Sequence, residues 1–536
     1  MDAIVMKPFR FQSLNSVILT ALVLTNLNLS ATTLYVSLES TNPVPPFATW
    51  ASAATNIQDA VDAAQAGDTV LVTNGVYAVG GRTERDEWDN EPSGRVVITI
   101  ALNLESVNGP LATTIEGAQN LITNELGGVR ADRLRCVYLG TNATLSGFTL
   151  RGGYAHVVGG GVYCGTSTVV TNCILRGNSA FGNRFPGGGV GGGGAYGGTL
   201  YDCSVDANSV TGEGGHGGGA NRSTLYNCSL TGNWAWVGGG VSSCTLYGCT
   251  LTGSKLGNRD KAGGPGILVE SSTLHNCMVT GGSVGGARSS TLYNCTVTGN
   301  SVGGTTGCSL FNCVVTGNDG GSGGEFYNCT VIDNQGGISG TAFNSIVYYN
   351  SGGNYGEGTT LNYCCTAPLP TNAVGNISGP PLFMDMAAGD FHLREDSPCV
   401  DAGTNLMGFP IMGWDDQWNP VVLGHITDPT DILGNTRFID GNGDGTVAWD
   451  IGAYEFNSFK PPRFSIAPRL TANGWRLNIT GAPNKWVHLQ RSSNLKNWED
   501  VWTDHGFRFF MGSEGVMQVT DWDTGPTAMF YRVIVQ

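Results

Sequence analysis

The chain has 536 residues, of which 82 are glycine, and only 13% are charged. This composition is typical of a folded, turn-dense β protein and excludes a disordered chain. The formal net charge is −15 at pH 7, which argues against binding of nucleic acid through its phosphates.

Residues 1–31 have the layout of a secretory signal peptide. Lys7 and Arg10 precede an apolar run over Val17–Leu24, and small and polar residues follow up to Ala31. The run is too short to span a bilayer, and no later segment has the length that a membrane-spanning helix needs. We therefore expect a secreted or cell-surface protein whose mature chain has no transmembrane segment.

Residues 32–135 are expected to form an N-terminal cap and the first coils. The spacing of Thr55–Gln58 is that of a capping box. Apolar residues then recur at helical intervals before Gly67, which predicts a short amphipathic helix that buries Ile57, Ala60, Val61 and Ala64. A strand over Asp68–Val72 and an Asn74-Gly75 turn are expected next.

An eleven-residue phrase repeats through residues 136–366, most clearly in Ser223–Asn233, Ser290–Asn300 and Cys308–Asn318. In the second copy Leu292 and Cys295 are three positions apart, so they share a face only if the chain turns between them. Asn294 tolerates the left-handed backbone conformation that such a bend needs. Each copy therefore reads as one coil of a parallel β-helix, and longer steps between copies predict Gly-rich loops inserted at one corner.

Nine of the fifteen cysteines occupy the same inward position in successive copies: Cys173, Cys203, Cys228, Cys249, Cys277, Cys295, Cys313, Cys329 and Cys364. Neighbouring Cβ atoms would lie about one strand spacing apart, slightly beyond the roughly 3.8 Å that a disulfide prefers. We predict a buried ladder of reduced thiols. No C-x-x-C pair or His cluster indicates zinc. Cys365 and Cys399 lie outside the ladder and are the best candidates for a disulfide.

Acidity is concentrated in residues 367–456, the closing segment, which holds thirteen acids and two bases, whereas residues 136–366 hold nine acids and eight bases. Beyond Pro461-Pro462 the pattern predicts a β-sandwich over residues 461–536. Its expected strands are the alternating runs Trp475–Thr480, Trp486–Gln490, Val516–Thr520 and Met529–Val535.

Several stretches resemble a known fold family. Asn56–Val61, Gly67–Val70 and Gly75–Tyr77 resemble the entry of pectin-lyase-like right-handed β-helix proteins, and Leu145–Leu150 followed by Gly159–Tyr163 is similar to their secreted bacterial repeat variants. The resemblance covers roughly residues 33–366 and implies a fold only. The expected fold class is all-β, a right-handed parallel β-helix with an N-terminal helical cap and a C-terminal β-sandwich.

The closing segment carries a second resemblance. Ser397–Gly403 and Asp450–Glu455 together resemble the choice-of-anchor Q domain, which follows β-helices in surface and secreted bacterial proteins. This resemblance implies a location rather than a chemistry.

Residues Asp440–Val447 resemble the opening of an EF-hand or dockerin calcium loop. Oxygen-bearing side chains stand at its positions one, three and five, and a glycine stands at position six. Position twelve, however, is Ile451 where such a loop needs a bidentate carboxylate. The candidate calcium ligands are Asp440, Asn442, Asp444 and the Thr446 carbonyl, and the alternative is an Asp/Gly-rich turn.

Candidate catalytic residues are few. Gly215-His216-Gly217 is similar to the Gly-His-Gly of polygalacturonases, but the carboxylate motifs of that family are missing from the repeats. The densest charge group in the repeats comprises Lys255, Arg259, Asp260 and Lys261. This group either decorates a solvated loop or contacts a sugar acid, with a lysine or the arginine as a lyase base.

Trp234 and Trp236 alternate with Ala235 and Val237, so both indoles should face one side. They form a stacking platform for sugars if that side is solvent, or pack under a Gly-rich loop if it is not.

The sequence as a whole favours a secreted or surface β-helix that binds an extracellular polysaccharide or a cell-surface ligand, with no nucleic acid partner and calcium as the only candidate cofactor. The alternatives are a polysaccharide lyase or glycoside hydrolase that acts on an acidic polysaccharide, and a structural rod. The fold alone does not decide among them.

Overall fold

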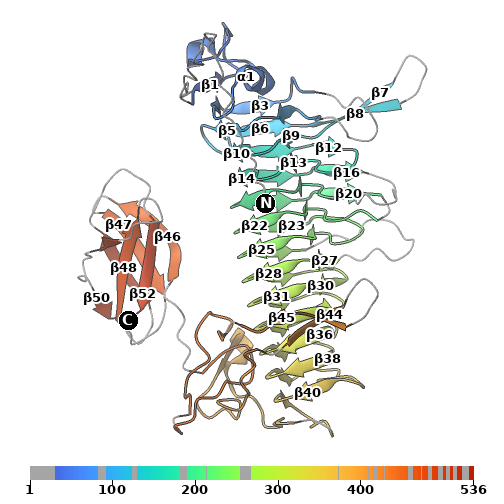
Figure 1. Ribbon diagram of the computed structural model, residues 1–536, viewed down its shortest axis with the longest axis vertical. Coiled ribbons are helices and arrows are strands. Elements are labelled where there is room, and N and C mark those ends of the chain that lie inside the picture. The colour runs from blue at the N-terminus through green and yellow to red at the C-terminus, as the bar shows by residue number, and fades with distance from the viewer. Residues whose placement is uncertain are drawn as a thin grey trace, which may run out of the picture.

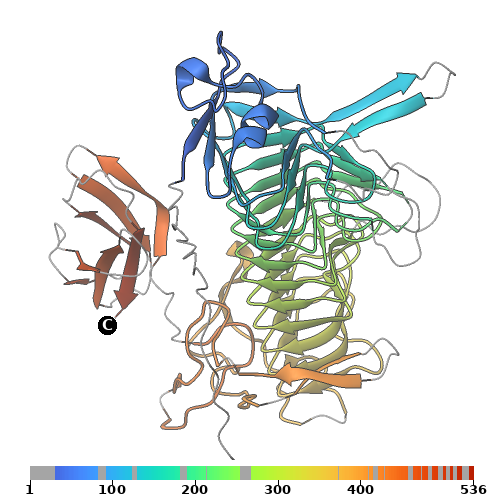
Figure 2. The ribbon, with the colours of Figure 1, turned by 45° about the horizontal axis from the view of Figure 1, so that its top comes forward.

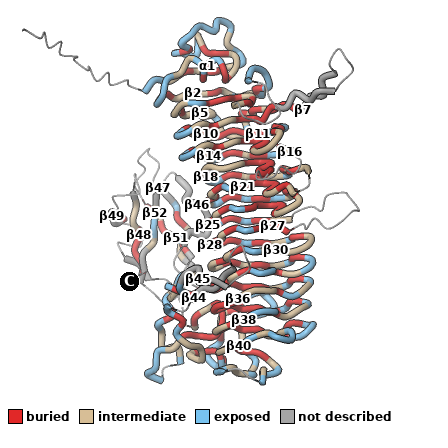
Figure 3. The backbone as a smooth tube through the Cα atoms, turned by 45° about the vertical axis from the view of Figure 1, so that its right-hand side comes forward, coloured by how far each residue is buried: buried red, intermediate tan, exposed pale blue. Residues whose placement is uncertain are grey.

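The computed structural model describes residues 31–82, 92–123, 129–181, 190–212, 214–253, 267–371, 374–408, 410–414, 420–427, 429–442, 444–456, 463–471, 474–480, 486–492, 499–501, 508–510, 516–521 and 530–535. The predicted signal peptide lies outside these residues, apart from Ala31. Figure 1 shows a solenoid of short stacked strands, whose inward residues form the buried interior in Figure 3.

The solenoid is a right-handed parallel β-helix with three long sheets, as the sequence predicts. The fourteen-stranded sheet comprises β1 (Thr33–Val36), β2 (Thr69–Val72), β5 (Asn103–Ser106), β10 (Thr144–Ser146), β14 (Val169–Thr171), β18 (Thr199–Tyr201), β22 (Thr224–Tyr226), β25 (Thr245–Tyr247), β28 (Thr273–His275), β31 (Thr291–Tyr293), β34 (Cys308–Phe311), β36 (Ser322–Tyr327), β38 (Ile338–Phe343) and β40 (Thr360–Asn362).

The thirteen-stranded sheet comprises β3 (Gly75–Tyr77), β6 (Thr113–Glu116), β11 (Thr149–Arg151), β15 (Ile174–Arg176), β19 (Ser204–Asp206), β23 (Ser229–Thr231), β26 (Thr250–Thr252), β29 (Met278–Thr280), β32 (Thr296–Thr298), β35 (Val314–Thr316), β37 (Thr330–Ile332), β39 (Ile346–Tyr348) and β41 (Cys365–Thr366).

The nine-stranded sheet comprises β4 (Val96–Ile98), β9 (Val137–Leu139), β13 (Val162–Cys164), β17 (Ala195–Tyr196), β21 (Ala220–Asn221), β24 (Val241–Ser242), β27 (Ile267–Glu270), β30 (Gly285–Arg288) and β33 (Thr305–Thr306). Two smaller elements flank it: a parallel sheet of β12 (Tyr154–Ala155), β16 (Ser179–Phe181) and β20 (Ser209–Thr211), and an antiparallel hairpin of β7 (Ala118–Thr123) and β8 (Val129–Leu134).

One coil shows why the repeat folds this way. Leu292 in β31 and Cys295 are both fully buried, and Asn294 between them has a φ of 53°. The left-handed bend turns the chain from the fourteen-stranded sheet into the thirteen-stranded one and keeps both side chains inside. The predicted parity and corner are therefore confirmed.

The cysteine ladder forms a continuous chain of contacts inside the solenoid. The amide N–H of Cys277 donates to the sulfur of Cys295 at 3.4 Å, and that thiol donates to the carbonyl of Tyr293 at 3.1 Å. All fifteen cysteines are buried and free. Cys365 and Cys399, the best candidates for a disulfide, pack in one cluster as two free thiols, so no bridge joins them.

A second interior ladder was not predicted. The buried Asn208 side chain accepts hydrogen bonds from the amide N–H and Nδ2 of Asn178, both at 3.0 Å, and its own Nδ2 donates to Leu175 O at 2.8 Å. Similar bonds link a lower series: Asn300, Asn318, Asn334, Asn350 and Asn354. These amides satisfy backbone groups that the corner between the thirteen-stranded sheet and the following loop leaves unpaired.

The N-terminal cap contains helix α1 (Ile57–Ala63) and a 3-10 turn, η1 (Trp50–Ser52). The helix is confirmed, but its cap lies one residue later than predicted. Asn56 accepts the amide N–H of Asp59 at 2.9 Å, so Asn56 rather than Thr55 is the N-cap residue. Gln58 is instead buried and exchanges two hydrogen bonds with the Val97 backbone, which fastens the helix to the nine-stranded sheet.

The closing segment folds back beside the last coils (Figures 1 and 2). It contains β42 (Phe383–Asp385), η2 (Met386–Ala388), β43 (Asp390–Leu393), β44 (Pro410–Trp414) and β45 (Pro420–His425). Arg437 is fully buried and pairs with Glu455 at 3.2 Å. Its Nη2 also donates to Asn312 Oδ1 at 3.3 Å, and Ala453 N donates to Thr330 Oγ1 at 3.0 Å. The closing segment is thereby hydrogen-bonded to more than one coil of the solenoid.

The C-terminal β-sandwich consists of two antiparallel sheets. One sheet holds β46 (Arg463–Thr471), β47 (Gly474–Thr480) and β51 (Val516–Asp521), and the other holds β48 (Trp486–Ser492), β49 (Glu499–Asp500), β50 (Arg508–Phe510) and β52 (Phe530–Val535). The runs predicted as strands are strands. The core lies between the sheets and is formed by Leu477, Ile479, Val487, Leu489, Val501 and Val519.

Candidate functional site

The predicted charge group Lys255, Arg259, Asp260 and Lys261 lies outside the described residues. His216 is half-buried and precedes β21, and its backbone forms β-bridges with Gly191 and Val237. Burial lowers the pKa of His216, and the positive charge of Arg222 lowers that pKa further. The imidazole is therefore neutral at physiological pH.

Trp234 and Trp236 are both half-buried, and Ala235 between them is buried in a small cluster with Val210. Ala235 is buried between the two half-buried tryptophans, whereas Val237, which was predicted to lie on the side of Ala235, is half-buried as well. The role of both tryptophans in carbohydrate binding stays a prediction.

The predicted calcium residues form a compact turn. Asp440 accepts the amide N–H groups of Asp444 and Gly445, and Asn442 Oδ1 accepts the same Asp444 N–H at 2.9 Å. Asp444 in turn accepts the Thr446 N–H at 2.7 Å. Across the described ranges, no three His, Cys, Asp or Glu side chains are grouped so that they could hold a metal ion. Calcium at this turn stays a prediction.

The nine-stranded sheet carries a row of polar and aromatic side chains on the face opposite the solenoid core, which we call the outer column; its middle members Asn221, Ser242 and Glu270 are buried. Strand register places one member on each successive coil, in the order Tyr138, Tyr163, Tyr196, Asn221, Ser242, Glu270, Arg288 and Thr306. With about 4.8 Å between strands, the row is on the order of 35 Å long.

Tyrosine and arginine side chains meet at the N-terminal end of the outer column. The Tyr138 and Tyr163 rings stack with 4.8 Å between centroids, and Tyr196 follows at 5.8 Å. The Arg135 guanidinium lies 5.9 Å and 5.6 Å from the first two rings, and Arg222 Nη1 donates to the Tyr196 hydroxyl at 3.3 Å. Cations at ring faces are stabilised by the negative π-face.

An ion pair stands at the other end of the outer column. Arg288 Nε donates to Glu270 Oε2 at 2.7 Å, and the two residues are register partners on β30 and β27. Glu270 is only 7% exposed, and Gly238 of the adjoining coil lies beside its Cβ. Burial raises the pKa of Glu270, and Arg288 opposes that shift.

A longer aromatic stack follows the fourteen-stranded sheet. Its eight rings have centroid distances of 4.8 to 5.8 Å and come from Tyr201, Tyr226, Tyr247, His275, Tyr293, Phe311, Tyr327 and Phe343. Leu406, Ile426 and Trp449 of the closing segment cover its lower rings. The sequence signals this stack, because an aromatic residue precedes the corner in each of these copies.

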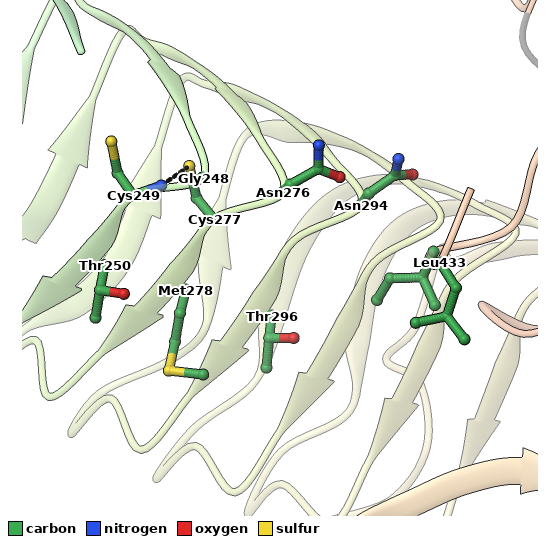
Figure 4. Close-up of a pocket in the computed structure, with 10 residues that line it drawn as sticks. Gly248, Cys249, Thr250, Asn276, Cys277, Met278, Asn294, Thr296 and Leu433 are labelled. Atoms are coloured by element: carbon green, nitrogen blue, oxygen red, sulfur yellow. Dashed lines mark hydrogen bonds between the residues drawn. The ribbon is translucent and has the colours of Figure 1, made fainter. Parts of the chain in front are cut away.

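A pocket of about 400 Å³ lies where the closing segment meets the thirteen-stranded sheet. Figure 4 shows Thr250, Met278 and Thr296 in a row on three neighbouring strands, with Asn276 and Asn294 at the corner above them. Leu433 closes one end. The sequence gives no signal for this pocket, because its parts are brought together only by the fold.

Comparisons with known proteins show the fold alone. No family model matches the sequence, and no curated protein matches it either. Among solved structures, the pectate lyase Pel9A is 12% identical with a TM-score of 0.29 over 80% of this chain and 98% of its own. A rhamnogalacturonan lyase is 11% identical, with a TM-score of 0.30 over 67% of this chain and 92% of its own. The Azotobacter vinelandii mannuronan C-5 epimerase AlgE4 A-module is 13% identical, with a TM-score of 0.27 over 60% of this chain and 92% of its own.

TM-scores this low do not identify a shared activity. The resemblance of the closing segment to the choice-of-anchor Q domain finds no support in these comparisons and stays a prediction. None of the helices in the described part of the chain has the length and apolar character needed to cross a membrane.

Proposed function

We propose that this protein binds an acidic polysaccharide outside the cell, with the polymer lying along the outer column. The observation that carries the proposal is the set of guanidinium groups at this sheet of a protein whose net charge is −15: Arg222 beside the outer column, Arg288 within it and paired with Glu270, and Arg135, which is 1% exposed and packs against the tyrosine end. A local surplus of positive charge on an acidic protein favours an anionic ligand at that place.

The side chains of the outer column suit such a polymer. Guanidinium groups bind carboxylates with two parallel hydrogen bonds, which a lysine does not reproduce. Tyr163 and Tyr196 add aromatic surface with a hydroxyl at the rim, a combination that contacts both the apolar and the polar sides of a sugar. Strands with one register from Tyr138 to Thr306 give a straight row, which is accessible at its tyrosine end and at Arg288 and Thr306. Between these ends the polymer would pass over Asn221, Ser242 and Glu270, which are only 6%, 2% and 7% exposed.

Binding is better supported than cleavage. Hydrolysis of a glycosidic bond needs two carboxyl groups that flank the bond. Among the outward positions of the described nine-stranded sheet, Glu270 is the one carboxylate. A lyase that acts on the same polymer is the second candidate, because Glu270 and Arg288 pair on β27 and β30, and β27 directly follows the segment with Lys255, Arg259 and Lys261 in sequence.

Secretion or surface display fits this role, and the C-terminal sandwich would serve attachment or a glycan contact. Trp234 and Trp236 would add a sugar contact outside the outer column. A structural rod remains the outcome if no polymer binds.

The test is affinity electrophoresis and calorimetry of residues 32–536 with polygalacturonate and alginate, compared with neutral xylan, with and without calcium. The double variant Glu270→Gln/Arg288→Gln removes a charge pair without leaving a lone buried charge, and Tyr163→Leu shortens the ring stack. We expect each to weaken binding about tenfold, the effect of losing one charged hydrogen bond or one ring contact.

Tyr226→Leu is the matched control, because Tyr226 is also stacked between two rings but belongs to the fourteen-stranded sheet. Equal loss with Tyr163→Leu and Tyr226→Leu, or equal binding of xylan, would refute the outer column as the site. Release of unsaturated products would replace binding with lyase activity.

A further inference from the structure

The pocket below the corner of the thirteen-stranded sheet belongs to a different face from the outer column. It is lined by Gly248, Cys249, Thr250, Asn276, Cys277, Met278, Asn294, Thr296, Ile432 and Leu433. None of these residues is charged, and the volume of about 400 Å³ is within the range of small-molecule sites. The polymer-binding role proposed above gives this pocket no function.

The wall of the pocket is held in place by a buried carboxylate. Asp431 is fully buried, and its Oδ1 accepts the amide N–H groups of Leu433 and Asn435, both at 2.9 Å. The amide N–H of Ile432 donates to Ala453 O at 3.0 Å, and that of Glu455 donates to Asp431 Oδ2 at 3.3 Å. Leu433 is therefore fixed to the rest of the closing segment, which is itself hydrogen-bonded to the solenoid through Arg437 and Ala453, rather than carried on an unsupported loop.

The corner of the pocket is the end of a directed chain of amides. Asn344 Nδ2 donates to Asn328 Oδ1, Asn328 Nδ2 to Asn312 Oδ1, and Asn312 Nδ2 to Asn294 Oδ1, at 3.2, 3.2 and 3.1 Å. The first three side chains are buried under the closing segment, whereas Asn294 is half-buried at the pocket. The direction of the chain uses the oxygen of Asn294, whereas its Nδ2 donates to none of the described residues and is left available at the corner.

Polarisation strengthens that donor. Each amide in a hydrogen-bonded chain increases the dipole of the next one. Arg437 also donates to Asn312 Oδ1 at 3.3 Å, so a buried positive charge stands beside the chain. The pocket thus offers an enhanced N–H donor at one edge.

The rest of the lining combines polar and apolar groups, as a sugar ring does. Thr250 and Thr296 supply hydroxyls, whereas Met278, which is 44% exposed, and Leu433 supply apolar surface between and beyond them. A neutral pyranose has hydroxyls around its rim and C–H groups on its faces, so it matches an uncharged lining of this kind. We propose that this pocket binds one neutral pyranose unit, with a sugar hydroxyl as the acceptor for Asn294 Nδ2.

The unit can be a free monosaccharide or part of a neutral glycan, since both present the same chemistry. The probes are the methyl glycosides of glucose, galactose, mannose and xylose, together with cellotetraose, mannotetraose and xylotetraose. Binding to residues 32–536 is followed by saturation-transfer NMR and calorimetry. Binding of a methyl glycoside indicates that one unit is sufficient, whereas binding of a tetrasaccharide alone indicates a chain.

The matched variants are Asn294→Gly and Asn227→Gly. Both residues have a φ near 50° at the same corner, and Gly248 occupies that position naturally with a φ of 62°. Only Asn294 lines the pocket. We expect Asn294→Gly to weaken binding roughly tenfold, the effect of one lost hydrogen bond, and Asn227→Gly to leave it unchanged.

Leu433→Ala is a second variant that opens the wall and leaves the corner intact, and we expect it to weaken binding several-fold. The proposal is overturned if no probe binds at millimolar concentration, or if binding survives both pocket variants. Neither result bears on polymer binding at the outer column, because binding of acidic polymers is measured in a separate experiment with Tyr163→Leu.

Discussion

Replacing Arg437 with methionine tests whether one buried ion pair holds the closing segment on the solenoid. The Arg437 and Glu455 side chains are 0% and 1% exposed. Methionine fills similar space but leaves Glu455 without its cation, and removing one partner of a buried pair typically costs about 3–5 kcal/mol. Burial already raises the pKa of Glu455 to about 9, so this carboxyl can take up a proton instead of staying charged. We therefore expect the lower end of that range, about 3 kcal/mol.

The loss of stability should be measured locally, at the residues that form the contact. Hydrogen exchange resolved by peptide should show faster opening of residues 429–456 in Arg437→Met, with little change in the coils around β10 and β14. Arg176→Met is the control, because its ion pair with Asp206 leaves the Arg176 side chain 67% exposed and should contribute less than about 1 kcal/mol. Equal and small effects of the two variants would refute the importance of the buried pair.

Three further outcomes are expected. Burial raises the pKa of Asp450 to about 6 and that of Glu455 to about 9, whereas both carboxyls titrate near 4 in the unfolded chain. The folded protein therefore binds more protons than the unfolded chain, and the melting temperature should fall as pH rises from 5 to 9. A melting temperature that rises over this range would contradict the prediction. Burial raises the pKa of Cys244 and of Cys364 to about 12, so iodoacetamide should label the native thiols far more slowly than the unfolded ones, and rapid native labelling would show that the ladder is open. Asn208→Ala leaves buried partners such as Leu175 O without a hydrogen bond, so it should lower the free energy of unfolding in denaturant by about 3 kcal/mol. The control Asn227→Gly should lower it by less than about 1 kcal/mol. Equal losses would show that the interior amides have no special role in stability.

The repeat was predictable because its signals are local. Leu292, Asn294 and Cys295 lie within four residues, so the inward faces and the corner follow from strand parity and from the backbone tolerance of asparagine. The sandwich strands were predictable for the same reason. The capping residue was placed one position too early, because Thr55 and Asn56 are both good N-cap residues and only the contact with Asp59 separates them.

The sites were not predictable because their residues come from different coils. Ser242 and Glu270 are register partners 28 residues apart (270 − 242), whereas the next pair, Glu270 and Arg288, is 18 residues apart (288 − 270), and this uneven spacing hides the register. Arg437 and Asn312 are 125 residues apart and meet only after the closing segment folds back. The same holds for Leu433 at the pocket. The interior asparagines Asn178 and Asn208 were also missed, because irregular spacing conceals that they stack.

The way in which the closing segment is bonded to the solenoid has a mechanical consequence. A parallel β-helix held only at its final strand would peel coil by coil under tension, since each coil contacts only its neighbours. Here the chain that leads to the sandwich is tied to Asn312, Thr330 and Asn344, on three separate coils. A pull on the C-terminal part is thus shared by these coils in parallel, and must shear several bonds at once before the rod begins to unwind.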